Sequence, residues 1–259
     1  MPLRRILAIC LIAAVPVLAQ APPDGPSVTA GHIHLNSADP DAAIGFWRDV
    51  IGASTVSSDS MKGVGMSGAT IFFAQKAASG PSAGSAIDHL AVRVADLQPF
   101  IKNLAKTTYK STNPQADKSR LMIDGPDGVL IEMIEDSSMY TSVEFSHIHL
   151  YSTKPQEMQA WYAGNFGGRL GTGENADSVQ IPGATLTFTR GDSPVPTAGR
   201  AVDHLGFEVK NIDSLRKKLS ENGARIDTPA HADPGTKAMI AFVTDPWGTS
   251  IELIERVAR

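Results

Sequence analysis

The sequence predicts an α+β protein built from four similar units of roughly 50 residues, each with a strand, a helix and then two or three short strands. Two observations carry this prediction. Near-identical segments, Leu130–Glu135 and Ser250–Glu255, close the second and fourth units. Strands that begin with a histidine recur at four places, 115 residues apart in corresponding units: Gly31–Leu35, Asp88–Val92, Ser146–Leu150 and Asp203–Phe207. A repeat of this size indicates duplicated supersecondary structure, in which the larger repeat is a pair of units.

The first and third units contain helices with clear start and stop signals. After the strand Gly31–Ser37, a helix is predicted from Pro40 to Ile51, with Asp39 as its N-cap and Gly52 as its end. The helix of the third unit begins at Pro155, and Gly167-Gly168 ends it. More polar helices are predicted in the other two units, at Asp96–Lys106 and Asn211–Asn222.

Short strands are predicted to close every unit. Explicit turns, Gly125-Pro126-Asp127-Gly128 and Asp245-Pro246-Trp247-Gly248, precede two of them. The closing strands are Thr70–Gln75, Val129–Glu135, Thr185–Arg190 and Thr249–Glu255.

The N-terminus has the pattern of a secretory signal peptide. Arg4 and Arg5 precede an apolar run over residues 6–18, and Ala19-Gln20-Ala21 fits a small-x-small cleavage site. The run is too short to span a bilayer comfortably, so a retained anchor is the weaker alternative. Residues 1–21 are therefore predicted to be removed, which makes the mature protein exported, either periplasmic or secreted. Residues 22–30 follow as a linker.

Composition excludes several functions. Cleavage would leave 27 acidic against 21 basic residues and no basic stripe, which argues against nucleic-acid binding. Because Cys10 is the only cysteine, the mature chain would have none, and a chain of this size can fold around its core without disulfides. No later segment is apolar and long enough to cross a membrane, so no membrane association is expected after cleavage.

Strand alternation places histidines and glutamates on one face of the predicted sheets. Alternate residues of a strand face the same side, so Leu90 and Val92 pack under the helix while His89 faces the other way. Glu132 and Glu252 likewise point away from the core in the closing strands. If paired units curl their sheets into a cup, this polar face becomes its interior.

A buried, isolated glutamate is costly unless it is paired or binds a metal. Two neutral imidazoles and one carboxylate suit a first-row divalent ion and leave coordination positions open, as in non-haem Fe(II) oxygenases. Fe(II) or Mn(II) is favoured, and Zn, Ni or Co is an alternative. The plainer interpretation is that these histidines only form hydrogen bonds, or that one half alone keeps a metal. The candidate ligands are His32, His89, Glu132, His147, His204 and Glu252.

Three further histidines have open roles. His34 and His149 lie two residues after candidate ligands and share their face of the strand. Four roles are open to them: hydrogen-bond donors to the ligands, substrate contacts, replacement ligands, or ordinary buried histidines. His231 lies in a loop rich in Pro, Asp and Gly, where it is either a general base or a surface residue. Glu132 and Glu252 are the other candidate catalytic residues.

These features resemble the vicinal oxygen chelate superfamily, which includes glyoxalase I, extradiol dioxygenases, methylmalonyl-CoA epimerase and bleomycin or fosfomycin resistance proteins. The resemblance covers residues 31–256 and is most specific at Asp203–Phe207, at the turn 245–248 and at Ile251–Glu255. It implies βαβββ modules that pair to form cup-shaped mixed sheets. The implied organisation is two tandem domains of two modules each, residues 31–136 and 145–256, joined by a linker at 137–144.

The family pattern takes metal ligands from the first strand of both modules and the last strand of one or both. Within each half, it gives two sets: His32, His89 and Glu132, and His147, His204 and Glu252. Some relatives pair modules one with four and two with three, which regroups the sets: His32, His204 and Glu252, and His89, Glu132 and His147.

The sequence departs from two subgroups of the family. Phe72 and Thr187 stand where glyoxalase I is expected to have a second glutamate in each site. Phe242 and Met122 stand where extradiol dioxygenases have a tyrosine ten residues before the glutamate.

The resemblance implies a metal-dependent enzyme whose small substrate binds the ion through two neighbouring oxygens, and the N-terminal pattern predicts that this enzyme is exported. We favour dioxygenase-like chemistry, because a facial triad leaves room for a bidentate substrate and O₂. A glyoxalase-I-like lyase or an epimerase or isomerase is the first alternative, and a non-catalytic binding or resistance protein is the second. The sequence does not decide between a monomer and a homodimer.

Overall fold

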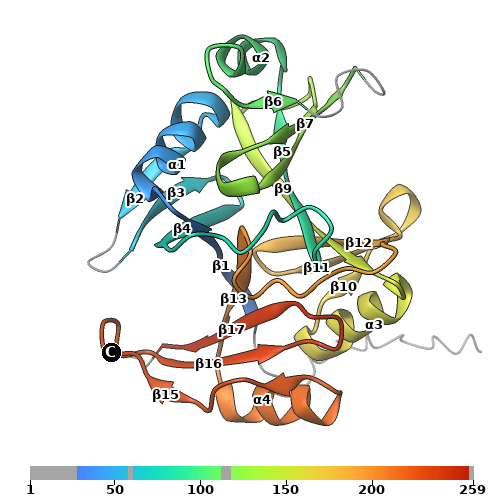
Figure 1. Ribbon diagram of the computed structural model, residues 1–259. Helices are drawn as coiled ribbons and strands as arrows, with labels where there is room; N and C mark the ends of the chain where they lie inside the picture. Colours follow the sequence, from blue (N-terminus) through green and yellow to red (C-terminus); the bar gives the residue numbers. More distant parts are fainter. Residues whose placement is uncertain (1–27, 58–60, 112–117, 257–259) are drawn as a thin grey trace, which may run out of the picture.

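The computed structural model describes residues 28–57, 61–111 and 118–256 of the 259-residue chain (Figure 1). The predicted signal peptide and its cleavage site lie outside the described residues. Within the described ranges, no helix is long and apolar enough to cross a membrane.

Two mixed β-sheets form the fold, as the sequence predicted (Figure 1). The first sheet, in spatial order, contains β14 (Arg225–Ile226), β16 (Met239–Thr244), β17 (Ser250–Glu255), β13 (Val202–Val209), β1 (Val28–Ser37), β4 (Ala69–Gln75), β3 (Lys62–Met66) and β2 (Ser54–Ser57), with β15 (His231–Ala232) beside β16. The second contains β10 (Arg169–Leu170), β11 (Ser178–Ile181), β12 (Ala184–Arg190), β9 (Val143–Ser152), β5 (Ile87–Val94), β8 (Leu130–Glu135), β7 (Arg120–Asp124) and β6 (Lys110–Ser111).

The sheets join modules across the two halves of the sequence. In the first sheet β1 of module one pairs antiparallel with β13 of module four, and in the second β5 of module two pairs with β9 of module three. The structure therefore has the second of the two module pairings that the sequence left open. Residues 31–136 and 145–256 repeat each other in sequence, but neither range forms a complete sheet alone.

The helices start and stop near the predicted residues. The Asp39 side chain accepts a hydrogen bond from the Ala42 amide, which confirms it as the N-cap of α1. Gly52 ends the predicted Pro40–Ile51 helix at φ 86°, a left-handed conformation that glycine adopts readily. The helical segments are α1 (Pro40–Phe46), its π-helical continuation η1 (Trp47–Ile51), α2 (Gln98–Leu104), α3 (Pro155–Phe166), α4 (Ile212–Glu221), and the 3₁₀ turns η2 (Pro126–Gly128) and η3 (Gly173–Asn175).

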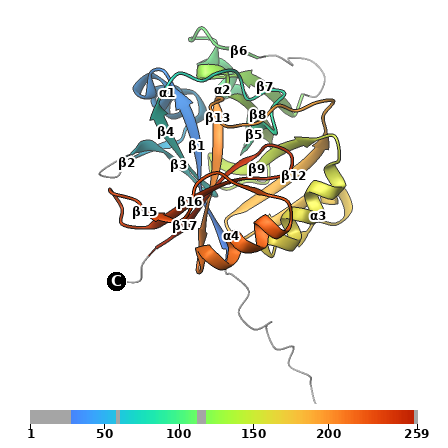
Figure 2. The same cartoon turned by 60° about the horizontal axis from the view of Figure 1, so that its bottom comes forward.

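Unlike the strands of each sheet, the helices pack against partners from the same half of the sequence. The Trp161 indole of α3 donates to the carbonyl of Asn222 at the end of α4, and Lys218 of α4 donates to Gly164 of α3. The two helices lie together in both views (Figures 1 and 2). Asn103 of α2 similarly donates to the carbonyl of Asp49 in η1. Each half is thus held by its helices, while each sheet is shared between halves.

Both faces of the central strands are buried. Leu90 and Val92 of β5 pack under the helical layer, as alternation predicted. His89 and Ala91 on the opposite face are buried as well, because that face lines the interior of the cup. The functional candidates therefore lie inside the fold.

Candidate metal centres

The first candidate centre, called centre I, lies where modules one and four meet. The Oε2 atom of Glu252 on β17 lies 3.2 Å from Nε2 of His32 on β1 and 3.5 Å from Nε2 of His204 on β13. All three side chains are largely buried. The strand pairing β1–β13–β17 places them side by side, because each faces the cup.

Centre II repeats this arrangement where modules two and three meet. The Oε2 atom of Glu132 on β8 lies 3.6 Å from Nε2 of His89 on β5 and 3.7 Å from Nε2 of His147 on β9. The structure thus brings all six predicted ligands together, in the regrouped sets. The sets within each half do not form, since β1 pairs with β13 and not with β5.

These distances fit ligands of a first-row divalent ion. Two donor atoms about 2.1 Å from one ion and at right angles to each other lie about 3 Å apart. The separations of 3.2 to 3.7 Å between Nε2 and Oε2 atoms need only a small contraction to reach that value. Two imidazoles and a carboxylate are also the donor types that Fe, Mn, Co, Ni and Zn accept.

The tautomers of two histidines favour metal binding. Nδ1 of His204 donates to Asp203 at 2.7 Å, and Nδ1 of His89 donates to Asp88 at 2.8 Å. A carboxylate on Nδ1 leaves the lone pair on Nε2, the arrangement common behind metal-bound histidines. The Nε2 atoms of His32, His89 and His204 are buried and make no hydrogen bond in the described structure. Their close approach to the glutamates thus suits a shared ion better than direct hydrogen bonds.

The glutamates remain charged near neutral pH. Burial raises the pKa of Glu252, but its attraction to the nearby imidazoles of His204 and His32 outweighs this effect and lowers the pKa to about 2. The pKa of Glu132 is also lowered to about 2, because His89 and Arg120 outweigh burial. Burial lowers the pKa of His147 to about 4, which keeps its imidazole neutral and able to bind a cation.

His34 and His149 lie inside the centres. His34 is opposite His204 in the pairing of β1 with β13, and their ring centroids are 4.6 Å apart. His149 is opposite His89, with ring centroids 4.3 Å apart. Burial lowers the pKa of His34 to about 4 and that of His149 to about 3, so both are neutral at pH 7.

An open cavity of about 490 Å³, called cavity I, lies over centre I. The three ligands and His34 line this cavity. The two phenylalanines that replace family residues lie on its walls: Phe72 contacts the ring of His32, and Phe242 contacts that of His204. The remaining lining residues include Met61, Ile240, Ile254, Arg256 and the loop 233–236.

His231 is not brought into either centre. It is exposed on β15, and its Nδ1 atom donates to the carbonyl of Pro229 at 3.0 Å. The following loop, residues 233–236, lines cavity I, but His231 is not among the described residues that do so.

The two centres differ in their neighbours. At centre II, Arg120 forms an ion pair with Oε1 of Glu132, the oxygen that does not face the histidines. The equivalent position on β16 is Ile240, because Arg120 pairs with Ile134 as Ile240 pairs with Ile254. Glu252 therefore has no arginine at the place from which Arg120 contacts Glu132.

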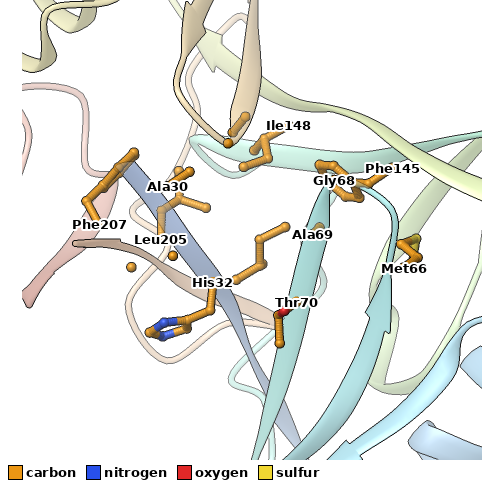
Figure 3. Close-up of a pocket in the computed structure, with 15 residues that line it drawn as sticks. Ala30, His32, Met66, Gly68, Ala69, Thr70, Phe145, Ile148, Leu205 and Phe207 are labelled. Atoms are coloured by element: carbon orange, nitrogen blue, oxygen red, sulfur yellow. The ribbon is translucent and has the colours of Figure 1, made fainter. Parts of the chain in front are cut away.

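A second cavity, of about 270 Å³, lies between the two sheets (Figure 3). Its walls include Leu205 and Phe207 of β13, Ile148 of β9 and Phe145. His32 lines this cavity as well as cavity I, so its strand separates the two spaces. The sequence did not predict this cavity, since it lies between modules that are distant in the chain.

Sequence reasoning missed the carboxylates behind the histidines. Asp88 and Asp203 directly precede His89 and His204, and this repeated Asp-His pair was a signal that could have found them. Arg120 carried no comparable signal, because a single arginine in a strand is typical of an exposed face.

Comparisons with known proteins agree with this architecture. A family model described as the Glyoxalase/Bleomycin resistance protein/Dioxygenase superfamily matches residues 29–133 and 144–253. The lactoylglutathione lyase of Escherichia coli O157:H7 is 39% identical over 57 residues, which cover 22% of this chain and 42% of that protein. This chain therefore spans less than half the length of that relative.

Solved structures show the same fold. Glyoxalase I from Zea mays superimposes with a TM-score of 0.68 at 15% identity, covering 89% of this chain and 93% of the other. A candidate dioxygenase from Bacillus subtilis gives a TM-score of 0.62 at 15% identity, covering 88% and 84%. Because the family model matches most of both halves, the chain belongs to the glyoxalase, bleomycin resistance protein and dioxygenase superfamily.

Proposed function

We propose that this protein is an exported, metal-dependent enzyme that binds a small substrate through two neighbouring oxygens at centre I. The observation that carries the proposal is the meeting of His32, His204 and Glu252 at one point inside an open cavity. A divalent ion there would polarise both oxygens and stabilise negative charge that develops on them. Fe(II) or Mn(II) is the favoured ion.

Centre I is the favoured catalytic centre because of its surroundings. Glu252 is free of the contact that Arg120 makes with the other carboxylate, and cavity I gives a substrate room beside the ligands. Phe72 and Phe242 stand on two sides of the histidines, where they would exclude water and pack against an apolar substrate body.

These walls favour dioxygenase-like chemistry on a planar substrate with adjacent oxygens, such as a catechol. Phe72 supplies no second carboxylate, so the ligand set expected of glyoxalase I is incomplete at centre I. Three protein ligands on one side leave coordination positions for a bidentate substrate and for O₂.

A lyase or isomerase is the second candidate, supported by the similarity to lactoylglutathione lyases over 57 residues. Glu252, or Glu132 at the other centre, would then move a proton next to the substrate oxygens. Export favours the first candidate over this one, because glutathione and acyl-CoA are scarce outside the cytoplasm.

The presence of O₂ separates the two candidates. Protein purified anaerobically and loaded with Fe(II) or Mn(II) is assayed with catechols and with the hemithioacetal of methylglyoxal and glutathione, with and without O₂. We expect catechol cleavage that stops without O₂ and consumes one O₂ per turnover. Turnover of the hemithioacetal at the same rate without O₂ would favour the lyase instead.

Matched variants locate the reaction. Glu252→Gln should abolish turnover, while Glu132→Gln should leave most of it. The His231→Ala variant should retain its metal, and a loss of turnover in it would establish His231 as a general base. Tight ligand binding by a wild-type protein that takes up no metal would contradict the proposal and identify a binding protein.

Export has a separate test. Expression of the full chain in a bacterial host, followed by mass determination of the periplasmic and secreted fractions, should give a product that begins after Ala21. A cytoplasmic product that retains residues 1–21 would contradict export without affecting the metal-site proposal.

A further inference from the structure

His34 and His149 are two buried histidines that the two-histidine, one-glutamate sets leave unused. Each lies two residues after a ligand, on the same face of its strand. Each also lies directly across an antiparallel strand pair from another ligand: His34 from His204, and His149 from His89. The same extra imidazole is therefore present at the same place in both centres.

Both residues have a buried nitrogen without a partner. The Nδ1 atoms of His34 and His149 are inaccessible and make no hydrogen bond within the described part of the chain. Leaving a buried polar atom unpaired is costly, so such atoms are uncommon unless something else binds them. The same atom is unpaired in both copies, which indicates a shared function.

The distances place each of these rings with the two other histidines of its centre. One ligand atom each from His32, His34 and His204 lies within 4.8 Å of the other two. The same holds for His89, His147 and His149. Two nitrogens on opposite sides of one first-row ion are about 4.2 Å apart, so small ring rotations would bring all three to bonding distance.

We propose that His34 and His149 are metal ligands, so that each centre binds its ion through three histidines and one glutamate. This inference rests on the metal sites of the proposed function and deepens it. A fourth protein ligand leaves two positions on a six-coordinate ion, which the two neighbouring substrate oxygens would fill. O₂ would then react with the bound substrate without a coordination position of its own.

Thr189 supports the assignment at centre II. Its hydroxyl lies 2.7 Å from Nε2 of His149, which occupies that nitrogen and leaves Nδ1 for the ion. The equivalent residue at centre I is Ala74, since Thr189 pairs with Tyr151 as Ala74 pairs with Asn36. Thr189→Val should therefore weaken metal binding at centre II by roughly 10–100-fold and leave centre I unchanged.

The main test measures metal affinity and ligand number. Metal-free mature protein is titrated with Co(II) by calorimetry, and Cu(II)-loaded protein is studied by pulsed EPR to count bound imidazoles. Wild type should bind two Co(II). His34→Ala should weaken one of these by more than the roughly 10–100-fold typical of losing an outer-shell partner, and should remove one imidazole from its centre.

Two further variants sharpen the test. His34→Asn places an amide oxygen near the position of Nδ1 and should recover part of the lost affinity. Thr55→Ala changes an exposed residue on β2 of the same sheet, outside both centres, so it should retain both ions with wild-type affinity.

The outcomes distinguish this inference from the proposed function. If His34→Ala keeps both Co(II) sites at wild-type affinity and the full imidazole count, His34 is not a ligand and the inference is wrong. A wild-type protein that binds no Co(II) would instead overturn the proposed function. His149→Ala repeats the measurement at centre II, so it remains decisive if circular dichroism shows that His34→Ala is unfolded.

Discussion

Gly206 lies directly opposite His32 in the pairing of β1 with β13, and a β-carbon at Gly206 would overlap the His32 imidazole. The equivalent residue at centre II is Ala91, which lies opposite His147. The two centres therefore hold their first-strand histidines against different neighbours. A β-carbon at position 206 would displace the His32 ring from its present place beside Glu252.

Gly206→Ala should selectively weaken metal binding at centre I. The added methyl group would rotate the His32 ring away from Glu252, with an expected loss of roughly 10–100-fold in affinity, as for other changes that misorient a ligand. Calorimetric titration with Co(II) would resolve the two centres. Ala91→Gly is the matched control, and it should leave the affinity of centre II near that of wild type. Equal affinities in Gly206→Ala and wild type would contradict this steric account.

Asp203→Asn should weaken metal binding at centre I, because Asp203 both orients the His204 ring and supplies negative charge behind it. Asp203 accepts hydrogen bonds from the Gly199 amide, from Asn36 and from Nδ1 of His204, each at 2.7 Å. An amide in its place would present a donor to His204 or a weaker acceptor. We expect a loss of roughly 10–100-fold in metal affinity at centre I, with centre II as an internal control. Asp88→Asn should produce the reverse pattern, and a uniform effect on both centres would exclude a local role.

Local structure was predictable from the sequence because its signals are local. The Asp39 cap and the Gly52 stop each depend on residues within one turn, and both were confirmed. The Asp96–Lys106 helix is shorter than predicted, at Gln98–Leu104. The Asp96 side chain accepts a hydrogen bond from the Gln98 amide, so Asp96 lies before the helix and not within its first turn.

Module pairing was not predictable, because β1, β5, β9 and β13 present similar alternating faces. Their sequence pattern does not distinguish β5 from β13 as the partner of β1, and in the structure that partner is β13. The ligand residues could be identified regardless, since either pairing brings two histidines to one glutamate. The contact of Arg120 with Glu132 depends on neighbouring strands and an exposed-looking charge, so sequence pattern alone does not predict it.

Phe242→Ala should weaken substrate binding without loss of metal. Phe242 lies beside Glu252 in the pairing of β16 with β17 and meets the His204 ring edge-on, with centroids 5.2 Å apart. An aromatic contact of this kind contributes about 1 kcal/mol, so the Kd for catechol at Co(II)-loaded protein should rise about fivefold. The Co(II) stoichiometry should stay at the wild-type value. Met122→Ala makes the corresponding change at centre II and controls for a general loss of packing in the cup. If both variants weaken catechol binding equally, centre I is not the substrate site.

Asp245 predicts a pH dependence of stability that is independent of the metal centres. Its carboxylate is buried, accepts hydrogen bonds from the Trp247 and Thr249 amides, and accepts another from the Tyr162 hydroxyl at 2.9 Å. Burial raises its pKa from 3.8 to about 6, although these hydrogen bonds act in the opposite direction. Between about pH 4 and pH 6 the folded protein therefore retains a proton that the unfolded chain has lost.

The sign of the effect follows from that proton. Because the folded state binds the proton more tightly, this group's contribution to stability is complete below about pH 4 and is lost as the pH rises through about 6. The shift of about two pKa units corresponds to about 3 kcal/mol. Asp245→Asn keeps an acceptor for the two amides and removes the titration, so its free energy of unfolding relative to wild type should rise by up to about 3 kcal/mol between pH 4 and pH 7. Urea unfolding of both proteins across this range measures the difference. Asp213→Asn, an exposed change on α4, should show no such trend, and a pH-independent difference for Asp245→Asn would mean that Asp245 is ionised throughout.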